Sequence, residues 1–180
     1  LWAGDKPNFL FIVADDCTYT DLEIYGGQAK TPHLNRLAKE GMMFSKCFQA
    51  APMCSPTRHC LYTGIYPVKS GAHPNHTFVN PGTKSIAHYL KVTGYRVALS
   101  GKSHVNPPAS FSFEYSNAKG KEGGAGNPNM EALDSLFDQA AQTTQPVAAF
   151  VCSNEPHTPY DKGNSSAYPI DQLQLPPHYV

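Results

Sequence analysis

Two adjacent carboxylates are the first residues in this sequence that could perform chemistry. Asp15 and Asp16 directly follow an apolar run, and neighbouring carboxylates repel each other unless a cation or a proton separates them. Hard oxygen donors favour calcium or magnesium over zinc, so the pair is a candidate metal site. The alternative is an acidic pair that closes a turn or caps a helix.

A cysteine followed by an arginine is the second candidate, in the stretch Cys54-Ser-Pro-Thr-Arg58. Pro56 is typical of the first turn of a helix, which places Cys54 at the positive end of the helix dipole and Arg58 one turn further on. We therefore expect a reactive thiol at Cys54. The alternative is a small buried cysteine. A cysteine hydrolase would also need a histidine partner, and no short pattern in the sequence assigns one.

The third candidate is a set of polar side chains that follow predicted strands, namely Lys102, His104, Glu155 and His157. Each has a simpler interpretation, such as a solvated lysine, a structural histidine or a histidine that braces a proline-rich loop. His73 and His76, in a loop rich in glycine and proline, are candidates for substrate contacts together with Glu155.

The elements around these residues alternate between strand and helix. Apolar stretches predict strands at 8–14, 42–48, 95–100 and 146–152, and helical periodicity predicts helices at 31–41, 55–64, 84–93 and 128–142. The first stretch is typical of a strand buried on both faces, and the segments 65–82 and 120–127 are predicted loops, the second one flexible. This order indicates a layered α/β fold with a largely parallel sheet, in which ligands bind beyond the carboxyl ends of the strands. The candidate groups lie at those ends.

Composition limits the class of protein. The chain has 180 residues, 41% of them hydrophobic, which suits one domain. Fourteen Lys and Arg balance fourteen Asp and Glu, so no electrostatic basis exists for binding nucleic acid or an anionic membrane surface. The longest apolar run, 9–14, is far below the roughly 18–20 residues that a membrane span needs. The five cysteines, Cys17, Cys47, Cys54, Cys60 and Cys152, lack zinc spacing, and their pairing stays open.

Taken together, the motifs resemble the type I sulfatases of the alkaline-phosphatase superfamily. The family signature Cys-x-Pro-x-Arg, followed by Thr-Gly, is present from Cys54 to Gly64. The resemblance extends to 7–16, 31–37, 101–104 and 156–159, in the order and spacing of the family. The wording of Gly-Lys-Ser-His-Val and Glu-Pro-His is closest to the branch that contains heparan N-sulfatase and polysaccharide sulfatases.

This resemblance implies a specific chemistry. A formylglycine-generating enzyme would oxidise Cys54 to formylglycine. One hydroxyl of its hydrated aldehyde attacks sulfur and releases the alcohol or amine, and the other drives elimination of sulfate and regenerates the aldehyde. The implied roles are calcium ligands at Asp15, Asp16 and the modified Cys54, stabilisation of the nucleophile by Arg58, sulfate contact by Lys102, orientation or deprotonation of the diol by His104, and proximity to the leaving group for His157.

The resemblance also implies an alkaline-phosphatase-like fold, of which residues 1–180 are the N-terminal part of a single catalytic domain. The later Asp-Asn or Asp-His pair and the second lysine of the family do not follow His157, and the sequence stops after Pro176-Pro177 without a closing element. Two carboxylates and one diol leave calcium short of its roughly 6–8 oxygen ligands, so we expect a C-terminal segment to complete the site.

The expected function is hydrolysis of a sulfate ester or sulfamate of a sulfated carbohydrate by an exported enzyme, whether periplasmic, secreted or lysosomal. The alternatives are a phosphonate monoester hydrolase or phosphodiesterase with the same nucleophile, and a non-catalytic relative that binds sulfated glycans. The sequence leaves open the sugar, the position of the sulfate and the choice between ester and sulfamate.

Overall fold

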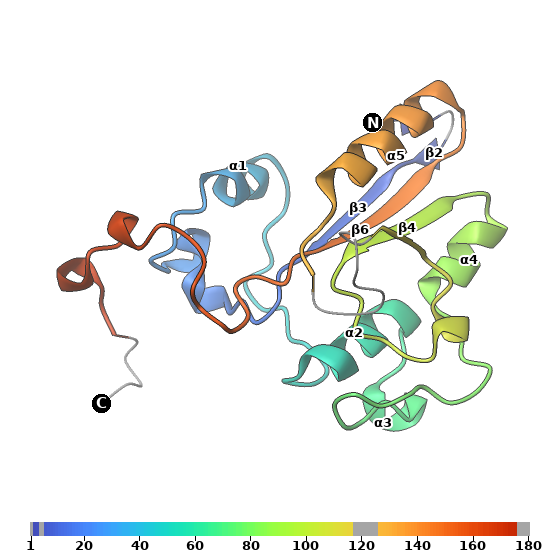
Figure 1. Cartoon of the computed structure of the whole chain (residues 1–180), viewed down its shortest axis with the longest axis horizontal. Coiled ribbons are helices and arrows are strands. Elements are labelled where there is room, and N and C mark those ends of the chain that lie inside the picture. Colours follow the sequence, from blue (N-terminus) through green and yellow to red (C-terminus); the bar gives the residue numbers. More distant parts are fainter. Residues whose placement is uncertain (1, 4–5, 117–125, 176–180) are drawn as a thin grey trace. The chain divides into compact units, whose positions relative to one another are not determined.

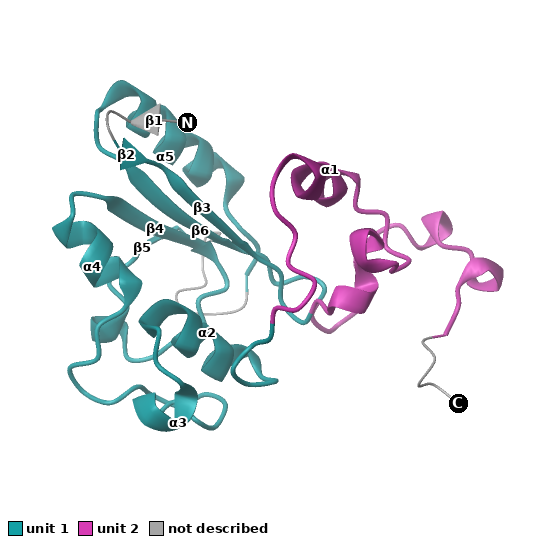
Figure 2. Cartoon of the chain, turned by 180° about the vertical axis from the view of Figure 1, so that it is seen from behind, with its two compact units in different colours: residues 1–16, 48–156 teal, residues 17–47, 157–180 magenta. Residues whose placement is uncertain are grey.

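The chain forms two compact units in the computed structural model, which describes residues 2–3, 6–116 and 126–175. The first unit combines 1–16 with 48–156, and the second combines 17–47 with 157–180 (Figure 2). The predicted flexible loop at 120–127 lies mostly outside the described residues, and so does the stretch that begins at Pro176.

A parallel sheet forms the centre of the first unit (Figure 1). Its four strands are β3 (Phe9–Val13), β4 (Arg96–Gly101), β5 (Glu114–Ser116) and β6 (Val147–Cys152), in the spatial order β3-β6-β4-β5. All three neighbouring pairs are parallel. Because β6 pairs with both β3 and β4, it separates the two strands that precede Asp15 and Lys102. A short antiparallel pair, β1 (Trp2–Ala3) and β2 (Lys6–Pro7), precedes the sheet.

Helices cover both faces of this sheet (Figure 1). Side chains of β6 alternate between two cores, so Phe150 packs with Tyr62 and Leu99 on one face, and Ala149 packs with Leu133 and Leu136 on the other. The first face carries α2 (Cys54–Thr63) and α4 (Ile86–Val92), and the second carries α5 (Met130–Gln142). The short helix α3 (Pro67–Ser70) follows α2. The layered α/β prediction is therefore confirmed.

Local sequence explains where these helices begin and end. The Asn129 side chain accepts a hydrogen bond from the amide of Ala132 and caps α5. Gly64 ends α2 with a left-handed φ of 70°, which a glycine adopts without steric cost. The described helices include none that is both long enough and apolar enough to cross a membrane.

The second unit consists of helices and turns in its described residues. It contains α1 (Pro32–Glu40) and the 3₁₀ helices η1 (Tyr19–Asp21), η2 (Glu23–Tyr25), η4 (Ser165–Ala167) and η5 (Ile170–Gln172). A fifth such helix, η3 (Pro108–Ser110), belongs to the first unit. Two mutual hydrogen bonds of 2.7 Å between Gln28 and the backbone of Gln174 join the two segments of the second unit.

Three expectations about the elements are wrong. The segment 42–48 is not a strand, because the described part of the second unit offers no strand for it to pair with, and Phe44 and Phe48 are exposed. β3 is not buried on both faces, since it is an end strand of the described sheet and its Leu10 and Ile12 are 52% and 63% exposed. The predicted loop at 65–82 contains α3.

Candidate active site

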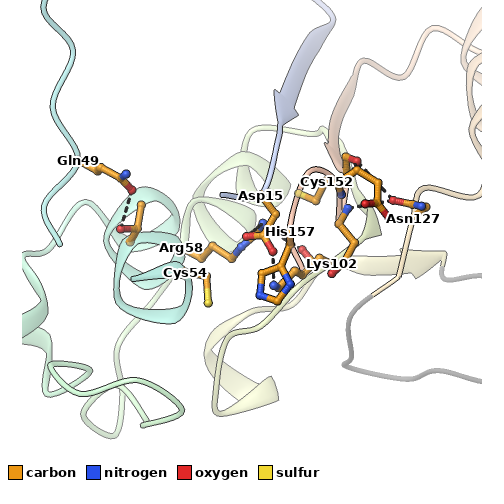
Figure 3. Close-up of polar contacts among 12 residues, drawn as sticks. Asp15, Gln49, Cys54, Arg58, Lys102, Asn127, Cys152 and His157 are labelled. Atoms are coloured by element: carbon orange, nitrogen blue, oxygen red, sulfur yellow. Dashed lines mark hydrogen bonds and ion pairs between the residues drawn. The ribbon is translucent and has the colours of Figure 1, made fainter. Parts of the chain in front are cut away.

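A buried carboxylate held between two cations forms the centre of the candidate site. Asp15 comes immediately after β3 and Ala14, and its Oδ1 accepts a hydrogen bond of 3.1 Å from Nη2 of Arg58. Its Oδ2 accepts a hydrogen bond from Nζ of Lys102 (Figure 3). The side chains of these three residues are at most 5% exposed. Segments distant in the sequence are thus brought together at the carboxyl ends of β3 and β4, as the sequence predicts.

The turn after β4 positions Lys102. Gly101 has a left-handed φ of 94°, and a Cβ at this residue would overlap the carbonyl of Cys152 on the neighbouring strand. The amide of Lys102 donates to that same carbonyl at 2.9 Å, and the Lys102 carbonyl accepts from Nη1 of Arg58 at 2.7 Å. Arg58 therefore holds both the backbone of Lys102 and the carboxylate of Asp15.

Cys54 begins α2, and Arg58 lies one helical turn further along the same helix (Figure 3). Residues four apart on a helix share one face, so the face of α2 that brings Arg58 to Asp15 also carries Cys54. The Cys54 side chain is partly buried, and its Sγ donates to Oδ1 of Asn75 at 3.9 Å. The paired acids and the predicted nucleophile therefore lie on the same side of the first unit.

The electrostatics of the cluster keep Asp15 and Arg58 charged. Burial raises the pKa of Asp15, but the hydrogen bond from Lys102 and the charge of Arg58 outweigh it, so the pKa lies below its usual value. Burial lowers the pKa of Arg58, but Tyr62, Cys152 and Asp15 together hold it above its usual value. The site thus combines one carboxylate with two cations, an excess of positive charge that suits an oxyanion such as sulfate.

His104 lies near this cluster but, unlike Asp15 and Arg58, carries no charge near pH 7. Burial, together with the charges of Lys102, His76 and Arg58, lowers its pKa to about 4. Its imidazole is therefore neutral near pH 7, and its Nε2 lies 2.8 Å from Nδ1 of His76. A neutral imidazole can form a hydrogen bond with a hydroxyl, which suits the expected orienting role of His104.

The other predicted site residues make different contacts from those of the cluster. Asp16 is exposed and has a left-handed φ of 55°. The carbonyl of Glu155 accepts from the amide of Asp15 at 3.3 Å, and His73 is exposed. His157 belongs to the second unit, where its Nδ1 lies 2.7 Å from the carbonyl oxygen of Thr158, so its role near the leaving group stays a prediction.

A calcium ion would find suitable donors here, although fewer than it needs. Asp15 and Asp16 offer hard carboxylate oxygens next to the end of a strand. Both oxygens of Asp15 already accept hydrogen bonds from Arg58 and Lys102. Among the described residues, no group of three or more His, Cys, Asp and Glu side chains is arranged to hold a metal ion. The residues therefore fit calcium in donor type and would supply part of its ligand shell.

Comparison with known proteins decides the family. Residues 7–174 match the Sulfatase family. The chain belongs to the sulfatase family. It is 35% identical to the ulvan-active sulfatase of Formosa agariphila over 158 residues, which covers 87% of this chain and 32% of that protein. It is 32% identical over 108 residues to the N-acetylglucosamine-6-O-sulfatase of Bacteroides thetaiotaomicron, covering 59% of this chain and 19% of that sulfatase. The chain therefore spans at most about a third of these curated sulfatases.

The sulfatase fold is also found by structural comparison. The crystal structure of Ps i-CgsB superimposes with a TM-score of 0.74 at 24% identity, covering 94% of this chain and 50% of that one. This likeness confirms the predicted alkaline-phosphatase-like α/β fold, seen here over its N-terminal part.

One residue of the candidate site was not predicted from the sequence. Asn75 contacts Cys54, yet in the sequence it stands out only as part of an Asn-His-Thr triplet typical of N-glycosylation. The signal that could have found it is the run His73-Pro-Asn-His76, which places three polar side chains within four residues of a loop.

Proposed function

We propose that this chain carries the nucleophile and the cation cluster of a sulfatase that hydrolyses a sulfated carbohydrate. The observation that carries the proposal is the buried Asp15 between Arg58 and Lys102, with Cys54 on the same face of α2 as Arg58. A cation cluster of this kind stabilises negative charge that develops on a transferring oxyanion, and such stabilisation is usually the largest part of catalysis.

The site residues of this chain have separate roles. Lys102 exchanges its hydrogen bond to Asp15 for a sulfate oxygen when substrate binds, while Arg58 remains with the carboxylate and keeps the loop of Lys102 in place. His104, neutral near pH 7, orients the attacking hydroxyl. His157 is assigned to the leaving-group oxygen by its position in the family motif.

The proposed active site also needs formylglycine and a calcium ion, both acquired after synthesis of the chain. Formylglycine, made from Cys54 by a formylglycine-generating enzyme, supplies a hydroxyl nucleophile when hydrated. Calcium, held by Asp15, Asp16 and the modified Cys54, supplies positive charge beside the sulfate. The remaining ligands of the ion and the second lysine of the family would come from a segment C-terminal to His157.

The substrate class rests on the relatives. One relative is named for activity on ulvan and the other for the 6-O-sulfate of N-acetylglucosamine, and both names support a sulfated carbohydrate as the substrate. Sulfatases of this kind act outside the cytoplasm, so we propose that the protein is exported.

The test is to express the complete protein in a host that has a formylglycine-generating enzyme. We expect the mass of the peptide that contains position 54 to match an aldehyde, and we expect release of sulfate from an aryl sulfate and a sulfated polysaccharide. Cys54→Ala should abolish both signals, whereas Cys47→Ala, a substitution at an exposed cysteine, should leave both unchanged.

Two results would contradict the proposal. An unmodified thiol at position 54 with no release of sulfate would favour a non-catalytic protein that binds sulfated glycans. Faster hydrolysis of a phosphate diester than of any sulfate would favour the phosphodiesterase.

A further inference from the structure

A line of hydrogen bonds connects Cys54 with His104 through two residues of the loop after α3. The Sγ of Cys54 donates to Oδ1 of Asn75 at 3.9 Å, and Nδ2 of Asn75 lies 3.2 Å from Nε2 of His76. In turn, Nδ1 of His76 lies 2.8 Å from Nε2 of His104. The line therefore joins the proposed nucleophile to His104 without passing through Asp15, Arg58 or Lys102.

The order of donors and acceptors along this line fixes the position of each proton. Nδ2 of Asn75 can only donate, so Nε2 of His76 must accept. A neutral His76 then carries its proton on Nδ1 and donates it to Nε2 of His104. Since Nε2 of His104 is an acceptor, a neutral His104 carries its own proton on Nδ1. A second proton on His104 would place two N–H groups against each other, which agrees with its lowered pKa of about 4.

Two observations distinguish this arrangement from ordinary packing. The buried His59 is a satisfied structural histidine, whose Nδ1 lies 2.7 Å from the Ser55 carbonyl and whose Nε2 accepts from the Asn106 amide at 2.9 Å. By contrast, Nδ1 of His104 is a buried atom without a hydrogen-bond partner in the described part of the chain. His76 and His104 also have left-handed φ angles of 60° and 49°. Such conformations persist in non-glycine residues where the surroundings hold them, and they cluster at functional sites.

We propose that Asn75 and His76 are positioning residues of the active site: Asn75 orients the group at position 54, and His76 holds His104 with its proton on Nδ1. For its effect on turnover this inference rests on the proposed sulfatase function. It replaces the substrate contact expected of His76 from the sequence, because both ring nitrogens of His76 are engaged within the chain.

The first test compares two substitutions of His76 in the complete, matured protein. His76→Leu removes the donor to His104, whereas His76→Asn keeps an N–H in a similar place. We expect His76→Leu to lower kcat by about 10- to 100-fold with little change in KM, as for other residues that orient a ligand through a second contact. His76→Asn should recover most of the loss, and Asn75→Leu should resemble His76→Leu. The matched control is His33→Ala, at an exposed histidine on α1, and it should leave kcat unchanged.

Three kinetic results would overturn the positioning role. An unchanged kcat for His76→Leu would remove it outright. A raised KM with unchanged kcat would return His76 to a substrate contact. An equal loss in His76→Leu and His76→Asn, accompanied by a lowered Tm in both, would reduce the line to a structural feature.

The second test does not depend on activity. In protein labelled with ¹⁵N-histidine, NMR couplings identify which ring nitrogen carries the proton, and comparison with His104→Gln assigns the signals. We expect the Nδ1 proton for His104 in the unsubstituted protein and a mixture of both forms in His76→Leu. An Nε2 proton in the unsubstituted protein would contradict the inference. A protein that releases no sulfate but has the Nδ1 form would refute the proposed function and leave the positioning inference intact.

Discussion

Removing the charge of Asp15 should harm the fold far more than removing that of Lys102. Asp15 is one negative charge facing the two positive charges of Arg58 and Lys102, and their side chains are 3%, 3% and 5% exposed. Asp15→Asn leaves two buried cations facing an amide. Breaking a buried ion pair by removing one partner costs about 3–5 kcal/mol, so we expect a loss of that size in the free energy of unfolding.

Lys102→Met leaves the neutral pair of Asp15 and Arg58 and replaces the lysine stem with an apolar chain of similar length. Oδ2 of Asp15 then lacks its donor, which costs about 1–3 kcal/mol. Burying an ammonium costs several kcal/mol, and that cost disappears. We therefore expect Lys102→Met to stay within about 1 kcal/mol of the unsubstituted protein, although it should abolish sulfate release.

The assay is urea and thermal unfolding, both followed by far-ultraviolet circular dichroism, in buffer with EDTA so that bound metal does not contribute. At about 2–4 °C per kcal/mol for a chain of this size, Asp15→Asn should lower Tm by roughly 6–20 °C. The reasoning would be refuted if Lys102→Met lost as much stability as Asp15→Asn. That result would mean that the lysine, rather than the balance of charge, stabilises the site.

Three further predictions follow from the same site. His104 has a pKa of about 4 in the folded chain against its ordinary value of 6.5, so the unfolded chain binds this proton first and the free energy of unfolding should fall as the pH drops from 6.5 toward 4. Urea unfolding at several pH values should show that His104→Gln lacks this pH dependence. The same pH dependence in the variant would argue against the prediction. Gly101→Ala should lower stability by at least about 2 kcal/mol in the same assay, because the added Cβ would overlap the Cys152 carbonyl at a left-handed φ; a neutral effect would mean that the turn after β4 adjusts easily. Removing calcium with EDTA should lower the Tm of the complete protein, and adding calcium back should restore it less in Asp16→Asn than in the unsubstituted protein. An equal recovery of Tm in the two proteins would exclude Asp16 as a ligand.

Local patterns in the sequence were sufficient for the elements that position the site. Pro56 predicts the start of α2, and the apolar run before Asp15 predicts β3. These signals work because capping and periodicity act over a few residues. The exposed residues of β3 were not predicted, because burial of a strand depends on what lies beside it, and an apolar run carries no information about its neighbours.

The features that the sequence did not predict depend on contacts between distant segments. Met42 to Phe48 has the apolar content of a strand, but a strand needs a partner, and the described second unit provides none. The three residues of β5 become a strand only because β4 lies beside them. Likewise, the contact of Asn75 with Cys54 depends on the path of a loop over 21 residues, which no spacing rule describes.

Strand β6 sets the distance between the segments that carry Asp15 and Lys102. Asp15 and Lys102 follow β3 and β4, and β6 lies between these strands, so the two chain segments are about 9.5 Å apart, twice the usual separation of neighbouring strands. The short carboxylate of Asp15 and the long ammonium stem of Lys102 meet across this gap. The reach of a lysine thus matches a gap set by sheet geometry, and a shorter side chain at position 102 would not reach Asp15.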